Sequence, residues 1–513
     1  MIAAAQLPDF GAIVGAGHLR LDPRSLEYFA RDIFFWPDAR LPRAVVAPGS
    51  VEEVQALVRA CAAAGLRIVC RGGGMSYSGG YVPHVDDCVI LDLRRLDRVR
   101  ELNLQDQYVT VEAGCTWMAL SAALEPSGLR PLFKPPYSGI HSTVGGMLSQ
   151  GIAEEMGGLL GLEVVLANGE RLSTGSGARA DDTSPFFRNF GPDLAGLFIA
   201  DGGTLGIKTA ATIALTPRPR ATGYASFAFE SFEALVRAMV VCSRERLACR
   251  MMGLDPRKSQ NAPRVGFRDA LQTLAKVALA KPNLAAGVRD ALGMAAAGRN
   301  FMEGVTWSLH LTLEGVSEAA VADAIAVQRA HALREGREIP NLLPMALAAK
   351  PYSVRGFLGP EGERWVPTNS MIPLSRGERA ATAVQAFFEA HRATMQQHGV
   401  WESYMLAARP GFVLIEPSFY WRDEVSALHL DHLDAASAAK FAGFAPNPAA
   451  RAFARELRDG LKQCLAAQGA VHVQLAKAYA WRSRIDPTAA RTWDSLRAAL
   501  DPSGILNPGN LDR

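Results

Sequence analysis

The feature that most restricts this chain is a glycine-rich run, Arg71 to Gly80, that directly follows a predicted strand. The run reads RGGGMSYSGG, so five of its ten residues are glycine. Glycine lets the backbone adopt positive φ and approach a ligand closely, and consecutive N–H groups can then form an anion-binding nest. A pyrophosphate suits such a nest. A plain turn is the alternative for one isolated loop of this kind.

Two more glycine-rich elements favour the ligand-binding interpretation. One is SGIHSTVGGMLSQG at 138–151, and the other is ADGGTLGIK at 200–208, which leads straight into a predicted strand. Three such loops in one strand-rich region indicate an extended cofactor that contains a diphosphate. The sequence lacks a GxGxxG that opens a helix and lacks GxxxxGK[ST], so neither the Rossmann fold nor the P-loop applies.

Around these loops the chain alternates strands and helices, beginning with a β-α-β unit. The predicted strands lie at 43–47, 66–70, 89–93, 109–113, 162–167 and 209–216. The predicted helices lie at 51–64, 117–125, 232–246, 267–299 and 316–336. Ser50 is the expected N-cap of the first helix, with Glu53 as its capping-box partner. After Pro219 the composition shifts toward Ala, Leu and Arg, so we expect a domain boundary there.

Composition excludes several classes of protein. The length of 513 residues predicts two to four packed units, at roughly 100–200 residues per domain. The hydrophobic share of 49% and the charged share of 20% exclude a disordered chain and a membrane bundle. A net charge of +3 gives no electrostatic reason to expect nucleic acid as a partner. No stretch approaches the ~20 consecutive apolar residues that would cross a bilayer.

Cysteine usage and the N-terminus predict a cytoplasmic protein. The N-terminus lacks a basic region followed by an apolar run and is a poor secretory signal. The seven cysteines form no CxxC pair, and we expect reduced thiols in the core. An apolar and basic segment at 267–297 is compatible with a membrane surface, or with amphipathic helices packed on a core or a dimer partner.

Six motifs, taken in order, resemble a known family. They are PGSVEEVQALVRAC (48–61), RGGGMSYSGG (71–80), STVGGMLSQG (142–151), GLEVVLANGE (161–170), DGGTLGIKT (201–209) and DPSGILNPG (501–509). The set resembles FAD-linked oxidoreductases of the vanillyl-alcohol oxidase and para-cresol methylhydroxylase type, which include flavin D-2-hydroxy-acid dehydrogenases. The resemblance covers nearly the whole chain.

This resemblance implies an α+β fold in three parts. Residues 1–218 are expected to form a two-subdomain FAD-binding domain of the para-cresol methylhydroxylase (PCMH) type. Residues 219–470 are expected to form an α+β cap domain with the substrate pocket. Residues 471–513 are expected to return to the FAD domain as a C-terminal tail.

The resemblance also assigns residues to FAD. Those that match the family's cofactor contacts are Arg71, Gly72, Gly73, Gly74, Met75 and Ser76 at the pyrophosphate, Ser142, Thr143, Gly145, Gly146 and Ser149 along the cofactor, Ile207 near the adenine, and Asn507 near the flavin ring. Many relatives link FAD covalently to a histidine. Here Met75 stands at one linking position, and the cap strand at 411–419, which resembles the other, has no histidine. We therefore expect non-covalent FAD, with His141 as the one remaining candidate for a link.

The catalytic residues are likewise carried over from the phenol-oxidising relatives. There a glycine-loop Tyr, a C-terminal Tyr-Arg pair and an Asp near the flavin hold a phenolate. Tyr77 matches the first, Trp481 and Arg482 match the pair, and Tyr137 stands at the Asp position. Arg482 is expected to bind a phenolate or carboxylate oxygen, with a surface ion pair as the alternative. Trp481 lacks the hydroxyl of the Tyr that the relatives carry at this position, and Tyr479 is a candidate to supply it.

Further candidates come from the tail and the cap. His472, on a predicted strand, is a candidate base for a hydroxyl proton, with a structural role as the alternative. The cap segment at 363–374 resembles the strand that lines the pocket in these oxidases. The expected pocket residues are Trp365, Asn369 and Met371, with Arg409 on the neighbouring strand.

No metal site is expected. An HxGDGNxH-like motif, which metal-assisted D-2-hydroxy-acid dehydrogenases carry, is missing. His429 and His432 lie three residues apart on a helical pattern, and we expect an exposed pair rather than metal ligands.

These observations predict an FAD-dependent oxidoreductase that transfers a hydride to flavin N5 from a C–H bond next to oxygen. The expected substrate is an aromatic, para-phenolic or other small alcohol. The alternatives are a D-2-hydroxy-acid dehydrogenase of the lactate or glycolate type and a flavin-binding protein without turnover. The expected partners are a small-molecule substrate and O₂ or another electron acceptor, and the family resemblance implies a homodimer through the cap.

Overall fold

The N-terminal β-α-β pattern folds into a small, mostly parallel sheet. The computed structural model describes residues 7–152, 156–255, 257, 304–352 and 357–512. The strand order is β1-β2-β4-β3, and β4 is parallel to both β2 and β3. The strands are β1 Leu19–Arg20, β2 Ala44–Val46, β3 Arg67–Arg71 and β4 Cys88–Asp92. The helices beside them are α1 Phe10–Val14, α2 Pro23–Phe29 and α3 Val51–Ala63.

Helix α3 confirms the predicted capping box. Glu53 N donates to Ser50 Oγ at 3.2 Å, and Gly49 N donates to Glu53 Oε2 at 2.7 Å. One face of the helix is apolar and fully buried, and it consists of Val54, Leu57, Val58 and Cys61. Gly65, at φ +67°, ends the helix region in the left-handed conformation that glycine adopts readily.

A second sheet completes the N-terminal half of the molecule. Its order is β5-β6-β10-β8-β9, with β7 paired to β10, and its pairs are antiparallel. The strands are β5 Val99–Asn103, β6 Tyr108–Glu112, β7 Leu129–Pro131, β8 Leu159–Val165, β9 Arg171–Ser173 and β10 Ile207–Pro217. The helices are α4 Trp117–Leu124, α5 Val144–Gln150 and α6 Leu194–Leu197.

After β10 the chain crosses into a third, antiparallel sheet that forms the cap. Its order is β14-β11-β13-β12-β17-β18-β15, with β16 paired to β18. The strands are β11 Ala221–Phe229, β12 Ala248–Leu254, β13 Trp307–Gly315, β14 Arg337–Glu338, β15 Arg364–Pro367, β16 Met371–Pro373, β17 Trp401–Arg409 and β18 Phe412–Trp421. The helices are α7 Phe232–Arg244, α11 Glu318–Ala332, α12 Leu342–Ala349, α13 Gly377–His398, α14 Ala427–Leu430, α15 Ala435–Phe441 and α16 Pro448–Ala467.

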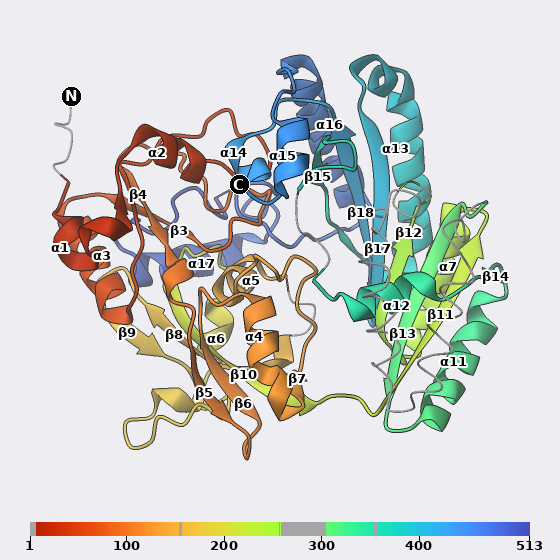
Figure 1. Ribbon diagram of the computed structural model, residues 1–513, viewed down its shortest axis with the longest axis horizontal. Helices are drawn as coiled ribbons and strands as arrows, with labels where there is room; N and C mark the ends of the chain where they lie inside the picture. The colour runs from red at the N-terminus through yellow and green to blue at the C-terminus, as the bar shows by residue number, and fades with distance from the viewer. Residues whose placement is uncertain (1–6, 153–155, 256, 258–303, 353–356, 513) are drawn as a thin grey trace.

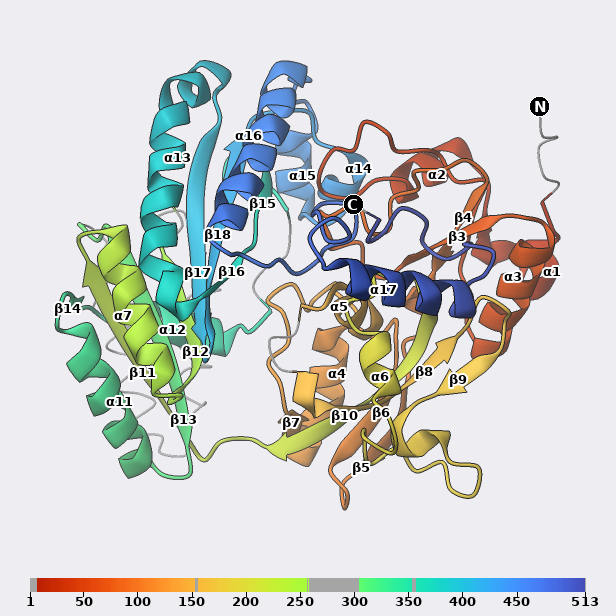
Figure 2. The ribbon, with the colours of Figure 1, turned by 180° about the vertical axis from the view of Figure 1, so that it is seen from behind.

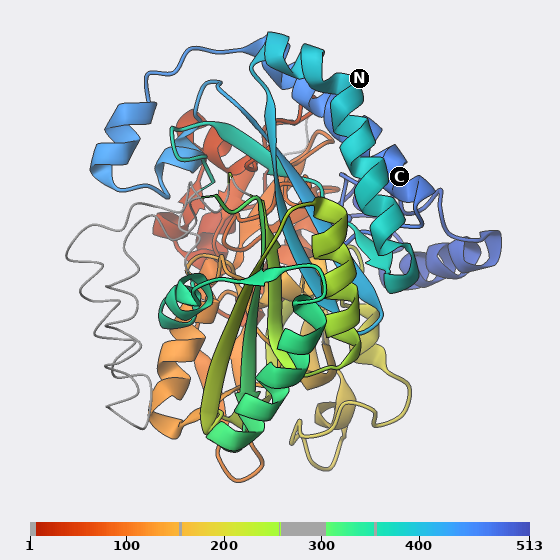
Figure 3. The ribbon, with the colours of Figure 1, turned by 90° about the vertical axis from the view of Figure 1, so that its right-hand side faces the viewer.

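The cap helices cover one face of the cap sheet. Figure 3 shows α7, α11 and α13 in front of the sheet, with the other two sheets behind it. Alternate residues of β17 and β18 are buried on the helical side, among them Leu406, Val413, Ile415 and Phe419. The opposite face of the cap sheet therefore turns toward the N-terminal half, as Figure 1 also shows.

The chain returns to the N-terminal half at its end. Helix α17, Pro487–Leu500, lies along the first two sheets (Figure 2), and Trp493 packs on the core of the second sheet. Leu506 bridges to Ile68 of β3. The exact division at 218 and 470 stays a prediction. A strand was expected around His472, but only Val471 forms a bridge, to Met371, because the chain turns at Gln474 and Ala476, both at positive φ.

The remaining expectations concern the cysteines, the segment 267–297 and membrane-spanning helices. All seven cysteines are unpaired. The segment 267–297 lies outside the described residues. No described helix is both long and apolar enough to span a bilayer.

Candidate active site

The structure brings the three glycine-rich loops together. A Cβ on Gly73 would lie 1.9 Å from the carbonyl oxygen of His141, and one on Gly72 would lie 2.4 Å from Thr143 Oγ1. Only glycine permits so close an approach of the first loop to the second. Gly202 N, in the third loop, donates to the carbonyl oxygen of Ser149 at 3.0 Å. The loops therefore form one continuous layer of backbone.

The first loop presents unsatisfied donors. Within the described part of the chain, no oxygen accepts a hydrogen bond from the N–H groups of Gly72 to Ser76. Gly74 has φ +71°, a conformation that helps successive N–H groups to converge. A run of free N–H groups at a junction that only glycine can form fits the pyrophosphate of a dinucleotide cofactor.

Side chains of the first loop support it from beneath. The Arg71 guanidinium is buried, with its Cζ 4.6 Å from the Phe29 ring centroid and 5.0 Å from that of Tyr81. A Cβ on Gly74 would lie 2.6 Å from Arg71 Nη2, so the guanidinium packs directly against the loop. Met75 packs against the cap core. Arg71 thus stiffens the loop.

The tail and the third loop meet at Asn507. Its Oδ1 accepts from Cys70 N at 2.8 Å, and its Nδ2 donates to the carbonyl oxygen of Gly202 at 2.6 Å. Within the third loop, Lys208 forms a buried ion pair with Asp201 at 2.6 Å. Ile207 begins β10 and is buried opposite Val165. Asn507 therefore ties β3, the third loop and the tail together, and its contact with a flavin stays a prediction.

The face of the cap sheet toward these loops carries a ladder of aromatic rings. Trp365, Tyr420 and Trp401 stand opposite one another across β15, β18 and β17. The ring centroids are 6.2 Å and then 4.0 Å apart, and both pairs are stacked. Tyr77 joins the ladder with its ring centroid 6.2 Å from that of Trp365. Tyr77 of the first loop thus reaches the cap face.

A buried polar cluster surrounds Tyr77. The Tyr77 hydroxyl accepts from Gln474 Nε2 at 2.9 Å. The Tyr479 hydroxyl accepts from Asn369 N at 3.1 Å, and Asn369 Nδ2 is buried without a partner in the described residues. Burial raises the pKa of both tyrosines, and the negative charge of Glu416 raises it further. The two phenols are therefore neutral at pH 7.

His472 completes this cluster. Its Nδ1 lies 2.6 Å from the carbonyl oxygen of Asn369, which can only accept, so Nδ1 carries the proton. The imidazole stacks on Tyr479 with the ring centroids 4.3 Å apart. Burial lowers the pKa of His472 to about 4, despite the hydrogen bond to Asn369. At neutral pH the ring is uncharged, and its Nε2 is the nitrogen that can accept a proton.

Two family models match the regions that build this site. The model described as "FAD binding domain" matches residues 42–175, and the model described as "FAD linked oxidases, C-terminal domain" matches residues 475–511. The chain therefore contains regions that match the FAD-binding domain and the C-terminal domain of FAD-linked oxidases. The first match contains the first two glycine-rich loops, and the second contains Tyr479 and Asn507. FAD is accordingly the cofactor for which these loops are built.

Curated relatives match part of the chain. A 1'-carboxy-chondrochloren decarboxylase of Chondromyces crocatus is 36% identical over 42% of this chain and 40% of its own length. A glycolate oxidase subunit of Bacillus subtilis is 32% identical over 39% of this chain and 42% of its own. A D-2-hydroxyglutarate dehydrogenase of Xanthomonas citri is 33% identical over 44% of this chain and 47% of its own length. The matches thus span less than half the length of these relatives.

Solved structures match nearly the whole chain in fold. A para-cresol methylhydroxylase with bound substrate has a TM-score of 0.72 at 17% identity, covering 98% of this chain and 95% of its own. A 4-ethylphenol oxidase from Gulosibacter chungangensis has a TM-score of 0.68 at 20% identity, with the same coverage. The expected α+β, PCMH-type architecture is therefore confirmed.

Gln474 and Arg458 are two members of this site that sequence reasoning missed. Arg458 lies on α16 with its side chain buried, and its Nη1 donates to the carbonyl oxygen of Tyr77 at 3.5 Å. The available signal was a charged residue on the apolar face of α16, beside Ala454 and Leu461. Gln474 gave no signal, because only a turn at positive φ brings its amide to Tyr77.

The side chains of Arg482 and Trp481 contact α17 rather than the cluster around Tyr77. Arg482 Nη2 forms a half-exposed ion pair with Asp494 of α17 at 2.6 Å. Trp481 packs edge-to-face on Trp493 of the same helix. The structure therefore has the ion pair that the sequence left open as the alternative for Arg482, and binding of a substrate oxygen by Arg482 stays a prediction. The chain turns after Tyr479, so that Tyr479 enters the cluster and the next residues meet α17.

The remaining pocket candidates are distributed along the cap face. Tyr137 lies under Arg250, whose Cζ is 4.4 Å from the Tyr137 ring centroid, and its hydroxyl lies 3.9 Å from Met252 Sδ. Met371 pairs with Leu414 of β18, and Arg409 ends β17. Tyr137 therefore does approach the cap, at β12 rather than beside Trp365.

His141, His429 and His432 contact other described residues. His429 is buried, with Nδ1 2.7 Å from Ser426 Oγ and Nε2 3.1 Å from the Ile33 carbonyl oxygen, so the expected exposed pair is wrong. The rings of His141 and His432 meet edge-to-face at 4.5 Å. No cluster of metal-ligating side chains occurs among the described residues.

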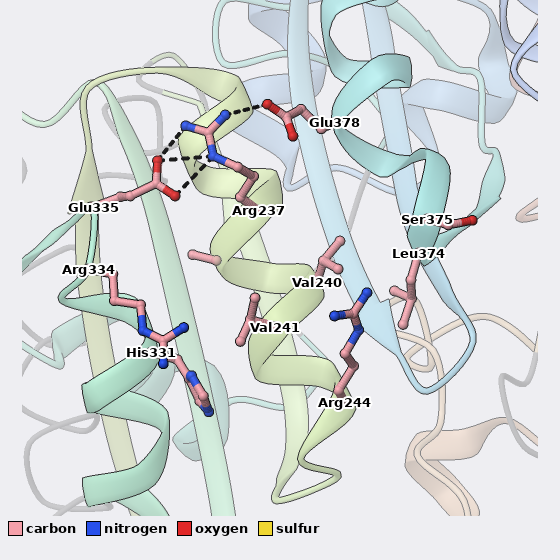
Figure 4. Close-up of a pocket in the computed structure, with 11 residues that line it drawn as sticks. Arg237, Val240, Val241, Arg244, His331, Arg334, Glu335, Leu374, Ser375 and Glu378 are labelled. Atoms are coloured by element: carbon pink, nitrogen blue, oxygen red, sulfur yellow. Dashed lines mark hydrogen bonds and ion pairs between the residues drawn. The ribbon is translucent and has the colours of Figure 1, made fainter.

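A separate hollow lies on the helical side of the cap. It has a volume of about 300 Å³ and is lined by α7, α11 and the start of α13. Figure 4 shows Arg237 between Glu335 and Glu378, with both carboxylates bonded to its guanidinium. This hollow is on the opposite side of the cap sheet from Tyr77.

Proposed function

We propose that this FAD-linked oxidoreductase removes a hydride from a C–H bond next to oxygen in an aromatic, para-phenolic or other small alcohol. The proposal rests on the position of Tyr77. Its hydroxyl lies in a buried polar cluster, its ring reaches the aromatic ladder of the cap, and its backbone continues the loop with the free N–H groups. One residue thus connects the cofactor loop with a pocket wall that suits an aromatic ring.

The chain's own residues would bind and orient the substrate. When bound, FAD supplies a hydride acceptor at its N5 atom. The hydroxyls of Tyr77 and Tyr479 would donate to the substrate oxygen, because each accepts one hydrogen bond from the protein and still has its proton to give. Trp365 and Tyr420 would hold the aromatic ring, and His472 Nε2 would accept a hydroxyl proton.

FAD would be held without a covalent bond. Met75 occupies the loop position where some relatives carry a linking histidine, and β18, FVLIEPSFYW, contains none. Precipitation of the protein with acid should therefore release the flavin into the supernatant. A yellow pellet would refute non-covalent binding and direct attention to His141.

A second candidate substrate is a D-2-hydroxy acid. Relatives named glycolate oxidase subunit and D-2-hydroxyglutarate dehydrogenase support it. Arg250, half-buried on the cap face above Tyr137, is a cation that suits a carboxylate. Binding there would leave Tyr77 and Tyr479 for the hydroxyl group.

Anaerobic flavin reduction tests both candidates. We expect para-hydroxybenzyl alcohol to bleach the visible flavin absorbance, and a D-2-hydroxy acid to leave it unchanged. Bleaching by the hydroxy acid alone would establish the second candidate. Bleaching by neither would favour a flavin-binding protein without turnover. The electron acceptor is then identified by comparing reoxidation by O₂ with reoxidation by a quinone.

A further inference from the structure

The hollow on the helical side of the cap carries an excess of positive charge. The arginines and glutamates that line it are Arg237, Arg244, Arg334, Glu335 and Glu378. Arg237 Nε donates to the two oxygens of Glu335 at 2.9 and 3.0 Å, and its Nη1 donates to Glu378 Oε1 at 2.6 Å. The hydrogen bond from Arg237 lowers the pKa of Glu335, so this carboxylate is ionised at neutral pH. Both acids are thus engaged by Arg237, and two further arginines remain.

Arg244 and Arg334 have no anionic partner in the described parts of the chain. Both residues are exposed, and neither guanidinium forms a hydrogen bond or an ion pair with a described residue. Figure 4 shows Arg244 extending from α7 toward Leu374, and Arg334 extending from α11 toward α7. Two unpaired guanidinium groups therefore border the same hollow from two different helices.

His331 stands beside Arg334 on the α11 wall and engages the one further acid found there. Its Nε2 lies 2.9 Å from Glu245 Oε1, whereas its Nδ1 is buried and meets no partner among the described residues. The carboxylate can only accept, so Nε2 carries the proton. Glu245 is therefore occupied by the imidazole and does not neutralise Arg334.

The floor of the hollow is apolar. Ala238, Val240 and Val241 of α7 form it, and Leu374 closes one side. The volume of about 300 Å³ is at the lower limit for pockets that hold small molecules. Helix α13 begins just after Leu374, and no side chain caps its first N–H groups, so the positive end of its dipole adds to the charge of the arginines.

These features together call for a ligand with two different parts. Guanidinium groups around one hollow repel each other, and a bound anion relieves the repulsion because each planar fork can donate to a carboxylate or phosphate. A bare inorganic anion would leave the apolar floor in contact with water, whereas an attached hydrocarbon chain would cover it. Charge and floor are thus both satisfied by an amphiphilic anion.

We propose that this hollow is a second ligand site, which binds a small amphiphilic anion: a carboxylate or a phosphate monoester with an aliphatic body. The anionic group would lie between Arg244 and Arg334, whose exposed side chains can turn toward it, and the aliphatic body would lie over Val240 and Val241. The site is on the opposite side of the cap sheet from Tyr77. The inference is therefore independent of the proposed function.

The test compares four probes on the FAD-loaded protein. Octanoate, octyl phosphate and octan-1-ol share one aliphatic chain and differ in the head group, and acetate has the carboxylate without the chain. Titrations followed by ligand-observed NMR give the affinities, and the melting temperature at each ligand concentration gives an independent measure of binding. We expect octanoate, octyl phosphate or both to bind with a dissociation constant on the order of 1 mM, because a ligand of this size reaches only modest affinity. Octan-1-ol and acetate should bind at least about tenfold more weakly.

Three variants locate the bound anion. Arg244→Gln and Arg334→Gln should each weaken binding about five- to tenfold, because each removes one charge-assisted donor. Arg246→Gln removes the same charge from an exposed arginine two residues away that does not line the hollow, and it should leave the affinity unchanged. The visible flavin spectrum should not change when the probe binds.

Three results would overturn the inference. Equal weakening in Arg246→Gln and Arg244→Gln would mean that net charge, and not the hollow, attracts the anion. Equal affinity for octan-1-ol and octanoate would mean that the arginines play no part. Binding that perturbs the flavin spectrum and persists in both Arg244→Gln and Arg334→Gln would place the anion at the cofactor.

Discussion

At the scale of single residues, His472 gives a pH-dependent prediction. Its pKa is about 4 in the folded chain and near 6.5 when unfolded, so between these values the unfolded chain binds a proton that the folded chain does not. The free energy of unfolding should therefore fall as the pH drops from 6.5 to 4, by on the order of 3 kcal/mol. Urea unfolding of the wild type and His472→Asn at pH 7 and pH 4 measures this. Equal pH dependence in the two proteins would contradict the assignment.

Residue roles were harder to predict than residue positions. Tyr77 and Asn369 could be predicted because motifs fix their place, and both lie in the buried cluster. Arg482 was matched to its position by sequence order, but a turn after Tyr479 sends its side chain to Asp494. Arg458 could not be predicted. A basic residue within an amphipathic helix does not reveal that its side chain will lie against Tyr77 and Tyr479.

At the scale of elements, the meeting of the first two glycine loops is the feature on which FAD binding depends. A methyl group on Gly73 would overlap the His141 carbonyl oxygen, so Gly73→Ala must push the loops apart. Overpacking costs about 1–3 kcal/mol, which corresponds to roughly five- to hundredfold weaker FAD binding. Flavin fluorescence on dilution of the holoprotein measures the change. Gly17→Ala, where a Cβ meets nothing within 4 Å, is the control, and equal FAD retention in both variants would refute the argument.

Elements with local signals were predicted within a few residues. The capping box located α3, and short apolar runs located β3 and β4. The tail was not predictable in the same way. A run of apolar residues around His472 suggested a strand, but the segment packs between both halves of the molecule and bends at Gln474 and Ala476. Its conformation is set by tertiary contacts, which local propensity does not encode.

At the scale of the whole molecule, the pocket depends on how the cap is held against the FAD-binding half. Glu314 of β13 crosses this junction and accepts from Arg130 of β7 at 2.6 and 2.9 Å and from Lys134 at 2.6 Å. Burial alone would raise the pKa of Glu314, but the two cations lower it to about 2. Because its folded pKa lies below its unfolded value, this link stabilises the molecule above about pH 4.5 and is lost as the pH falls toward 2.

Glu314→Gln should therefore loosen the junction without disturbing either half. Removing one partner of a partly buried, charge-assisted set costs about 1–3 kcal/mol. Calorimetry at neutral pH should show a lower melting temperature for the cap relative to the FAD-binding half, and a higher KM because the pocket wall bearing Trp365 is less firmly placed. Glu335→Gln removes an ion pair to Arg237 within the cap alone and is the matched control. If both variants melt alike, the orientation of the cap is set by the apolar contacts at Tyr77 and Trp365, and Glu314 contributes no more than a surface charge.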